Sequence, residues 1–200
     1  MFLMPTTIND LIISDTSVAE RLRQYAEGRR KGNILIYGPK GLGKTEAAKA
    51  VARTKAAIFD DFEPLIIRGS SVRADFETQI LNDWNIQTLN GVKNPFVVID
   101  EVDELNNKQQ RILRAHLDRY QQIGNVVLTT NHRERLDVPL INRCDAIEMP
   151  PIDPKDWLGK SQGYLSANRK SFTDQSVLDV LATTDGSIRD IMRAIDDLLM

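Results

Sequence analysis

The sequence contains little that would support disulfides, zinc binding or membrane insertion. It has one cysteine, Cys144, and two histidines, His116 and His132. A single thiol cannot form an intrachain disulfide, and we expect no structural zinc site from so few ligands. No apolar run approaches the roughly 20 residues needed to cross a bilayer, and residues 1–14 do not resemble a signal peptide. We therefore expect a cytoplasmic protein (host cytoplasm if viral) without a membrane partner.

The sequence also lacks an excess of charge of one sign. Its 26 basic and 28 acidic residues give a net charge of −2. A strongly basic chain would by itself indicate nucleic-acid binding, and this chain is not one. Any contact with DNA must therefore come from a local patch or from several subunits that pool one.

Short apolar runs alternate with helical patterns in the first three quarters of the chain. Runs that are apolar almost throughout occur at residues 33–37, 64–67, 95–99 and 126–128. Such runs are typical of parallel strands buried on both faces. Helices are expected from a capping box at 17–20, from the Ala-rich residues 45–54, and from an apolar stripe of Ile112, Leu113, Leu117 and Tyr120. The pattern predicts an α/β core whose parallel sheet has helices on both faces.

Beyond residue 150 the pattern is helical only. Asp153 precedes a proline at a helix start, and Thr173 and Ser187 each precede a further helix. The last helix has an apolar stripe formed by Ile188, Ile191, Met192, Ile195, Leu198 and Leu199. We therefore divide the chain into an α/β nucleotide-binding core, residues 1–150, and a small all-α lid, residues 151–200.

A phosphate-binding loop lies between the first strand and the Ala-rich helix. The pattern is G-x-x-x-x-G-K-[ST], in which glycines and the helix N-terminus direct backbone N–H groups at phosphates. Lys44 is expected to bind the β- and γ-phosphate oxygens, and the Thr45 hydroxyl to bind Mg²⁺. The predicted ATP or GTP ligands are Gly38, Pro39, Lys40, Gly41, Leu42, Gly43, Lys44 and Thr45.

Two acids follow the strand at residues 95–99. Acids at the carboxyl end of a parallel strand face the crevice where ligands bind. Asp100 would hold Mg²⁺ through a water, and Glu101 would polarise the attacking water as a base or positioning group. Alternatively, both are solvated loop acids, like Asp103 and Glu104 after them.

These motifs, with a later strand ending in Thr129-Thr130-Asn131, resemble those of the AAA+ ATPases. The resemblance implies a P-loop fold with a helical lid, ATP as the nucleotide, and ATP hydrolysis. In that family a polar residue after this strand reads the γ-phosphate or orients the water, and Asn131 stands there. Asn131 could instead cap the turn into His132.

Two arginines resemble those of the sliding-clamp loaders within that family. Residues 140–149 resemble their Ser-Arg-Cys box, with Asn142 in place of Ser, so Arg143 would reach the ATP of a neighbouring subunit as an arginine finger. Residues 186–189 resemble their sensor-2 segment, so Arg189 would reach the γ-phosphate from the lid. Alternatively, each is an ordinary solvated arginine.

The resemblance to clamp-loader ATPase subunits, those of replication factor C and of phages, covers residues 6–199. Residues 7–12 are similar to the segment that packs near adenine, and Arg68 replaces an Asn of the family's Asn-x-Ser segment. Clamp loaders carry a helical collar domain after the lid, which this sequence does not contain. The family implies homologous or identical subunits in a ring or spiral.

The helix after the Asp-Glu pair faces DNA in clamp loaders. Lys108 and Arg111, near its start, could meet phosphates, or could belong to a solvated helix face. The leading hypothesis is a clamp-loader-like ATPase in DNA replication, with a sliding clamp as client. The alternatives are a helicase loader or replication-initiation ATPase of a phage or mobile element, and an ATP-gated assembly module with little turnover.

Overall fold

Five parallel strands form the centre of the computed structural model, which describes residues 5–56, 63–73 and 75–200. The order in the sheet is β2-β3-β4-β1-β5, and every neighbouring pair is parallel. The strands are β1 (Asn33–Tyr37), β2 (Ile66–Arg68), β3 (Phe96–Asp100), β4 (Asn125–Thr130) and β5 (Cys144–Glu148). Because all five run the same way, their carboxyl ends share one edge.

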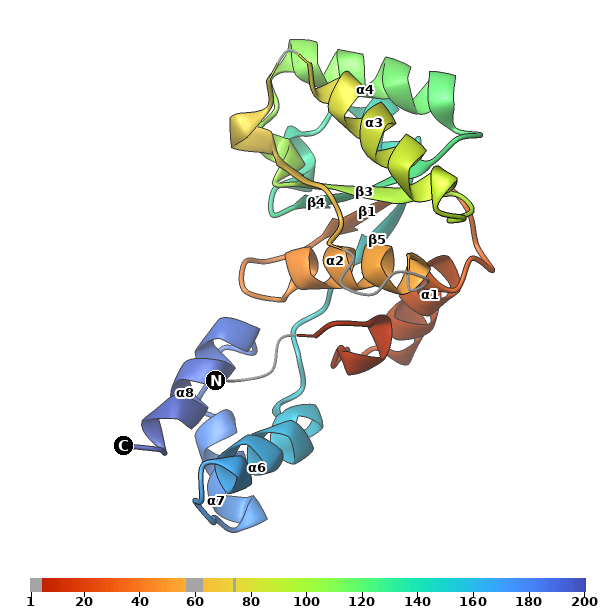
Figure 1. Cartoon of the computed structure of the whole chain (residues 1–200). Coiled ribbons are helices and arrows are strands. Elements are labelled where there is room, and N and C mark those ends of the chain that lie inside the picture. Colours follow the sequence, from red (N-terminus) through yellow and green to blue (C-terminus); the bar gives the residue numbers. More distant parts are fainter. Residues whose placement is uncertain (1–4, 57–62, 74) are drawn as a thin grey trace.

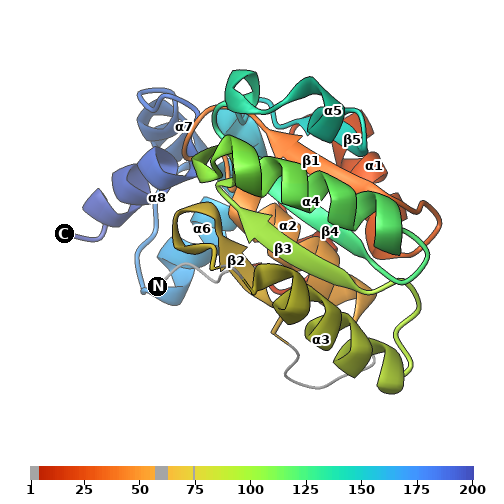
Figure 2. The same cartoon turned by 90° about the horizontal axis from the view of Figure 1, so that it is seen from above.

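Helices cover both faces of this sheet, as predicted (Figures 1 and 2). One face carries α1 (Thr16–Ala26) and α2 (Lys44–Lys55). The other carries α3 (Phe76–Leu89), α4 (Asn107–Tyr120) and α5 (Val138–Ile141). Short 3₁₀ turns complete the connections: η1 (Ile8–Asp10), η2 (Gly69–Ser71), η3 (Val102–Glu104), η4 (Arg133–Arg135) and η5 (Pro154–Trp157).

Successive side chains along each strand point to opposite faces of the sheet and pack into two separate apolar cores. In β1, Ile34 and Ile36 point toward α1 and α2, whereas Leu35 points toward the helices of the opposite face. All three are fully buried. A strand with both faces covered is apolar at every position, which explains why these runs show no polar alternation.

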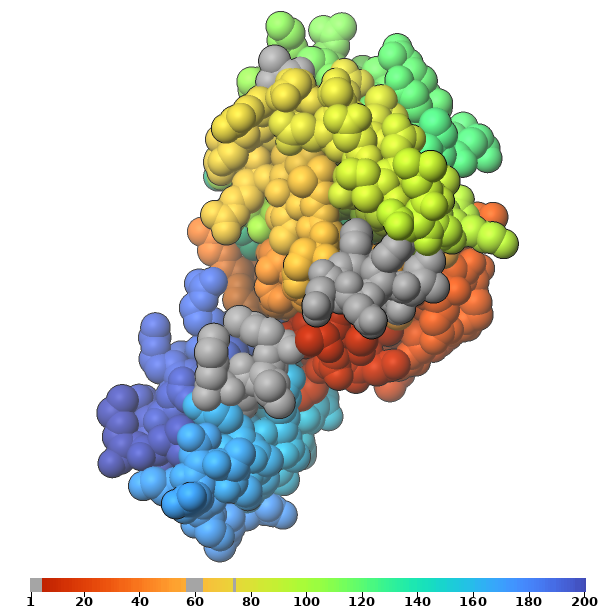
Figure 3. Space-filling model, in the orientation of Figure 1, coloured from red at the N-terminus to blue at the C-terminus, as the bar shows by residue number. Residues whose placement is uncertain are grey.

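The C-terminal helices have a core of their own. Helices α6 (Leu158–Ala167), α7 (Asp174–Leu181) and α8 (Ile188–Asp197) surround a third apolar cluster, which includes Trp157 and Ile191. Figure 1 shows these blue segments as a lobe below α1 and α2, and Figure 3 shows the same lobe in space-filling form. Thr173 and Ser187 cap α7 and α8 as predicted, whereas Asp153 caps η5, and α6 begins only at Leu158.

Some local predictions were wrong. The capping box at 17–20 does not form: Asp15 caps α1 by accepting bonds from the amides of Ser17 and Val18. That helix ends at Ala26. Strand β2 is shorter than predicted, and α3 was not predicted at all. None of the helices in the described ranges is long and apolar enough to cross a membrane.

A pair of glycine substitutions tests the packing of α3. A Cβ on Gly124 would lie 2.6 Å from indole carbons of Trp84, which is 1% exposed and has no room to move. Gly124→Ala should therefore lower the free energy of unfolding by about 1–3 kcal/mol in urea titrations. The control is Gly159→Ala on α6, where nothing lies within 4 Å of the added carbon; it should raise stability by up to ~1 kcal/mol. Equal effects of the two changes would contradict this packing.

Candidate nucleotide-binding site

An open cleft of about 710 Å³ lies at the carboxyl edge of the sheet, between the sheet and α8. Besides Lys40, Gly41 and Gly43 of the loop between β1 and α2, it brings together six further predicted residues, which come from α2, the carboxyl ends of β3 and β4, and α8. They are Lys44, Thr45, Asp100, Glu101, Asn131 and Arg189. These six residues, which are up to 145 positions apart in the sequence, therefore share one solvent-accessible space, which is large enough for the phosphates of a nucleotide.

The loop between β1 and α2 has the backbone expected of a phosphate cradle. Gly38, Gly41 and Gly43 have φ angles of 144°, 85° and 75°, a region that favours glycine. A Cβ on Gly38 would also lie 2.7 Å from the carbonyl oxygen of Met149. Pro39 and Lys40 are exposed at the tip, whereas Leu42 is buried and anchors the loop to the core.

The Lys44 side chain lies inside this loop. It is 7% exposed, and its Nζ donates a hydrogen bond of 2.6 Å to the carbonyl oxygen of Pro39. Burial lowers the pKa of the Lys44 ammonium, and the charges of Asp100 and Asp103 oppose that change. The two carboxylates favour the charged form of Lys44, and a charged ammonium beside the backbone amides of this loop is suited to bind an anion.

Asp100 joins three elements through its carboxylate. Its Oδ1 accepts a hydrogen bond of 2.7 Å from Thr45 Oγ1 on α2, and another from Thr129 Oγ1 on β4. Asp100 is 8% exposed, so its position is fixed by these partners rather than by solvent. A hydroxyl and a carboxylate oxygen at this separation are the hard donors that Mg²⁺ prefers, so the residues fit the predicted metal.

Glu101 has a strained backbone next to this carboxylate. Its φ of 54° and ψ of 51° are left-handed, which is uncommon for a residue with a side chain. The Glu101 amide donates a bond of 3.1 Å to Thr129 Oγ1, and a Cβ on Gly69 would overlap the Glu101 carbonyl oxygen. These two contacts hold the turn so that the Glu101 side chain is exposed along the cleft.

Two threonines of β4 are site residues that the sequence analysis missed. Thr129 is 2% exposed and supports both acids of the cleft, as described above. Thr130 Oγ1 donates to Asp103 Oδ1 at 2.6 Å and accepts from the amide of His132 at 2.9 Å. The turn into His132 is thus capped by Thr130 and not by Asn131. The one available signal was a pair of hydroxyls ending an otherwise apolar strand.

Helix α8 begins directly on the phosphate loop. The Ile188 amide donates a bond of 2.8 Å to the carbonyl oxygen of Gly41. A Cβ on Gly41 would lie 2.7 Å from Cβ of Ser187, and one on Gly43 would lie 2.6 Å from Cδ1 of Ile188. The exposed Arg189 follows at once and lines the cleft. The start of α8 therefore places a guanidinium beside the loop.

A small apolar pocket of about 70 Å³ adjoins the cleft. Its walls come from residues 11–13, from Leu42 and Met149 of the core, and from Trp157 and Met192 of the C-terminal lobe. Gly43, Glu46, Ile188 and Met192 line both spaces. The two spaces therefore share a wall formed by the starts of α2 and α8.

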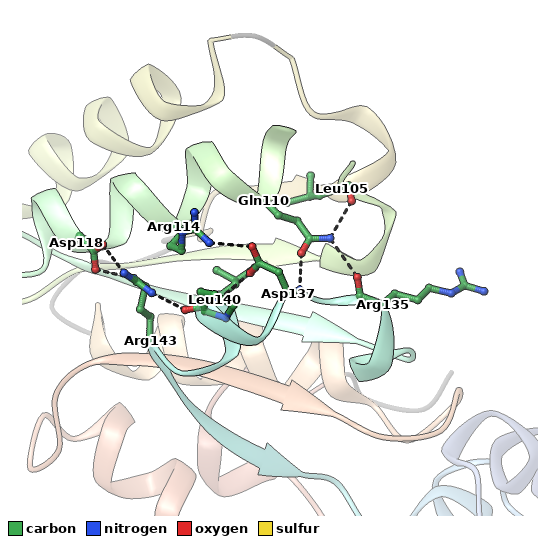
Figure 4. Close-up of polar contacts among 9 residues, drawn as sticks. Leu105, Gln110, Arg114, Asp118, Arg135, Asp137, Leu140 and Arg143 are labelled. Atoms are coloured by element: carbon green, nitrogen blue, oxygen red, sulfur yellow. Dashed lines mark hydrogen bonds and ion pairs between the residues drawn. The ribbon is translucent and has the colours of Figure 1, made fainter. Parts of the chain in front are cut away.

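Arg143 does not line the cleft. It directly precedes β5 and therefore lies at the amino end of the parallel sheet, whereas the cleft is at the carboxyl edge. Its Nε and Nη2 donate to the two carboxylate oxygens of Asp118 at 2.6 and 2.8 Å, and its Nη1 donates to the Pro139 carbonyl at 2.6 Å (Figure 4). The ion pair raises the pKa of Arg143 and lowers the pKa of Asp118. The structure therefore does not bring Arg143 to the cleft of its own chain.

The remaining predicted residues, Lys108 and Arg111, are exposed in the first turns of α4. Gln110, between these two residues on the buried side of the helix, is 2% exposed. Its Nε2 donates to the carbonyls of Leu105 and Arg135 at 3.1 and 3.3 Å, and its Oε1 accepts from the Asp137 amide at 2.9 Å (Figure 4). This amide ties the start of α4 to the turns that precede α4 and α5.

Comparison with protein families gives one match across the core. Residues 34–151 match the profile described as the ATPase family associated with various cellular activities (AAA).

Similar curated proteins are replication factor C small subunits. The chain is 26% identical over 188 residues to that of Methanosphaera stadtmanae and 29% identical over 187 residues to that of Methanothermobacter thermautotrophicus. It is 22% identical over 188 residues to a putative replication factor C small subunit of Acanthamoeba polyphaga mimivirus. These matches cover 92%, 92% and 90% of this chain but 58%, 58% and 55% of the relatives. The chain thus spans little more than half the length of these relatives.

Solved structures share the fold. The RuvB Holliday junction branch migration motor of Thermotoga maritima superimposes with a TM-score of 0.76 at 19% identity, over 98% of this chain and 65% of that one. Domain III of the Thermotoga maritima replication initiation protein DnaA superimposes with a TM-score of 0.66 at 15% identity, over 100% of this chain and 88% of that one. At these identities the likeness concerns the fold alone.

Removing the hydroxyl of Thr129 tests the hydrogen bonds that support the two acids. Thr129→Val keeps the shape of the side chain but leaves the Glu101 amide and one Asp100 oxygen without this partner. The free energy of unfolding should fall by about 1–3 kcal/mol in urea titrations. Thr129→Ser, which retains the hydroxyl, should lose less. A valine variant as stable as the wild type would show that these bonds do not hold the turn.

Proposed function

Because the chain belongs to the AAA family of ATPases, we propose that it binds MgATP in the cleft and hydrolyses it where subunits of an oligomer meet, as a clamp-loader-like protein in DNA replication. The observation that carries this proposal is the cleft itself, in which Lys44, Thr45, Asp100 and Glu101 lie together at the carboxyl edge of a parallel sheet. A division at residues 150 and 151, with the C-terminal helices acting as a lid, is part of the proposal.

Each residue of the cleft has a role that its surroundings support. Lys44 and the amides of residues 38–45 hold the β- and γ-phosphates. Thr45 and Asp100 would hold Mg²⁺, which would neutralise charge on the phosphate oxygens. Glu101 orients or deprotonates the attacking water, and the exposed side chain and fixed backbone at this position suit that task.

Asn131 and Arg189, which also line the cleft, are proposed to distinguish ATP from ADP by contact with the γ-phosphate. Asn131 is proposed to contact the γ-phosphate or the attacking water, and its alternative role as the cap of the turn is taken by Thr130. Arg189 is proposed to reach the γ-phosphate from α8, which supports ATP-dependent placement of the lid. The adenine would occupy the apolar pocket beside residues 11–13.

Arg143 is proposed to act on the ATP of a neighbouring subunit. Its position away from its own cleft agrees with delivery to another chain, because an arginine finger neutralises charge that develops on the transferred phosphoryl group. The proposed partners are therefore further copies of this chain or homologous AAA+ subunits, in a ring or spiral. An ATP-gated assembly module with little turnover has no use for Glu101, so hydrolysis is preferred.

The similarity to replication factor C small subunits favours a sliding clamp as client, and a helicase is the alternative client. Direct contact with DNA is proposed for Lys108 and Arg111, which are exposed on α4 and available to phosphates. In one chain of net charge −2 this basic patch is small. Several subunits side by side would supply several such patches.

Two substitutions in the cleft separate binding from hydrolysis. Lys44→Ala should abolish the heat of MgATP binding in calorimetry, because the loop loses its buried ammonium. Glu101→Gln should still bind MgATP but lose turnover by about 10²–10⁴-fold, the usual contribution of a base. Lys40→Ala removes an exposed ammonium from the same loop and should bind far better than Lys44→Ala. MgATP uptake that is unaffected in Lys44→Ala would overturn the assignment of the site.

Arg143→Ala tests the contribution between subunits. It should leave MgATP affinity unchanged and lower turnover by about 10³-fold, the lower end of an arginine finger's effect.

Wild-type turnover should rise with protein concentration, as subunits associate, and with primed DNA. DNA-independent turnover at all protein concentrations would contradict the replication role. Full turnover of Arg143→Ala would contradict the role of this arginine.

A further inference from the structure

Asp118, near the C-terminal end of α4, is the carboxylate that meets the proposed arginine finger. It binds the Nε and Nη2 edge of the Arg143 guanidinium with two hydrogen bonds, and the Pro139 carbonyl binds Nη1 (Figure 4). Paired bonds of this kind fix the plane of a guanidinium as well as its position. The Arg143 side chain therefore has one preferred orientation although it lies at the surface.

This ion pair is too exposed to lock the arginine away. The side chains are 32% and 55% exposed for Arg143 and Asp118, and ion pairs in contact with water contribute little to stability because water solvates both charges. The pair thus selects a rotamer without imposing a large energetic barrier. An interaction of this strength can orient the Arg143 side chain, but it cannot keep the side chain from binding elsewhere.

The guanidinium keeps donors for a further partner. It has five N–H groups, and the three bonds to Asp118 and Pro139 engage three of them. Two N–H groups, one on each terminal nitrogen, remain for oxygens of a phosphate. Asp118 and a phosphate can therefore be bound by the same side chain at the same time.

Further polar contacts join the elements around the pair. Arg114, one turn before Asp118 on α4, forms an ion pair of 3.2 Å with Asp137, which caps α5. Gln110 accepts a hydrogen bond from the Asp137 amide at 2.9 Å. Helix α4 and the segment that leads to Arg143 are thus joined at successive turns, and Asp118 forms the last of these connections (Figure 4).

We propose that Asp118 is a positioning residue for Arg143: it holds one edge of the guanidinium so that the remaining N–H groups face the nucleotide of the neighbouring subunit. The proposal rests on the proposed function, in which Arg143 acts between subunits. Asp118 does not touch the nucleotide. It restricts the rotamers of the Arg143 side chain before the phosphate binds, so that Arg143 loses less conformational entropy on contact with the phosphate.

Mixed oligomers test this role, since the finger and the ATP site can be placed on different subunits. A Lys44→Ala subunit donates a finger but binds no ATP, and an Arg143→Ala subunit binds ATP but donates no finger. Their mixture should turn over ATP faster than either alone. Adding Asp118→Asn to the finger-donating subunit should lower the kcat of the mixture by about tenfold, within the ~10²-fold loss that a misplaced group can cause. The KM for ATP should not change.

Three controls separate positioning from a structural effect. Asp118→Asn on the Arg143→Ala subunit should cause no comparable loss, because that subunit has no finger to orient. Asp118→Glu on the donor should restore most of the turnover, since a glutamate can form the same paired bonds. Glu20→Gln on the donor removes another surface carboxylate that pairs with arginines, on α1, and should leave kcat unchanged. Solution mass should be equal for all mixtures.

The outcomes also distinguish this inference from the proposed function. If the parent mixture is no faster than its components, Arg143 does not act between subunits, and the proposed function fails at that point. If the parent mixture is active but Asp118→Asn on the donor leaves kcat unchanged or raises it, Asp118 does not position the finger. Equal loss from Asp118→Asn on either subunit would likewise overturn the inference, because it would indicate an effect on assembly.

Discussion

The site depends on one carboxylate that is shared between two hydroxyls. Asp100 accepts a hydrogen bond from Thr45 at the start of α2 and another from Thr129 in β4. It is thereby connected to the phosphate loop on one side and to the support of Glu101 on the other. This convergence is possible because β1, β3 and β4 are adjacent and parallel, so the segments that follow them meet at one edge. An antiparallel neighbour would send one of these groups to the far end of the sheet.

Features encoded by contiguous residues could be predicted from the sequence, and features that depend on a distant partner could not. The phosphate loop and the acidic strand end are local patterns, and they lie together in the cleft. Thr129 was missed because its value comes from contact with Asp100, 29 residues away in the chain. Helix α3 was missed because exposed Ile86 and Leu89 blur its buried stripe. The N-cap of α1 was misassigned because Asp15 and Ser17 are both good capping residues, and only the geometry selects Asp15.

Helix α4 links several features that the sequence treats as separate. Its exposed basic residues lie in the first turns, its buried Gln110 ties that end to neighbouring turns, and Asp118 meets Arg143 near the other end. A motif identifies Arg143, but nothing near it in the sequence identifies its partner. The pairing arises from the packing of α4 beside α5 on one face of the sheet, over Leu113, Leu117 and Leu140. One continuous helix thus connects the exposed Lys108 and Arg111 to the partner of Arg143.

The contact between α8 and the phosphate loop has a further consequence. The Ile188 amide donates a hydrogen bond to the Gly41 carbonyl oxygen. A Cβ on Gly41 would clash with Cβ of Ser187, and one on Gly43 would displace the Ile188 side chain. Glycine at these positions thus has two effects. It allows the positive φ angles of the loop, and it allows α8 to pack close to the loop backbone. A larger residue in the loop would therefore also shift the first turn of α8, so the conformation of the loop and the position of this helix are coupled.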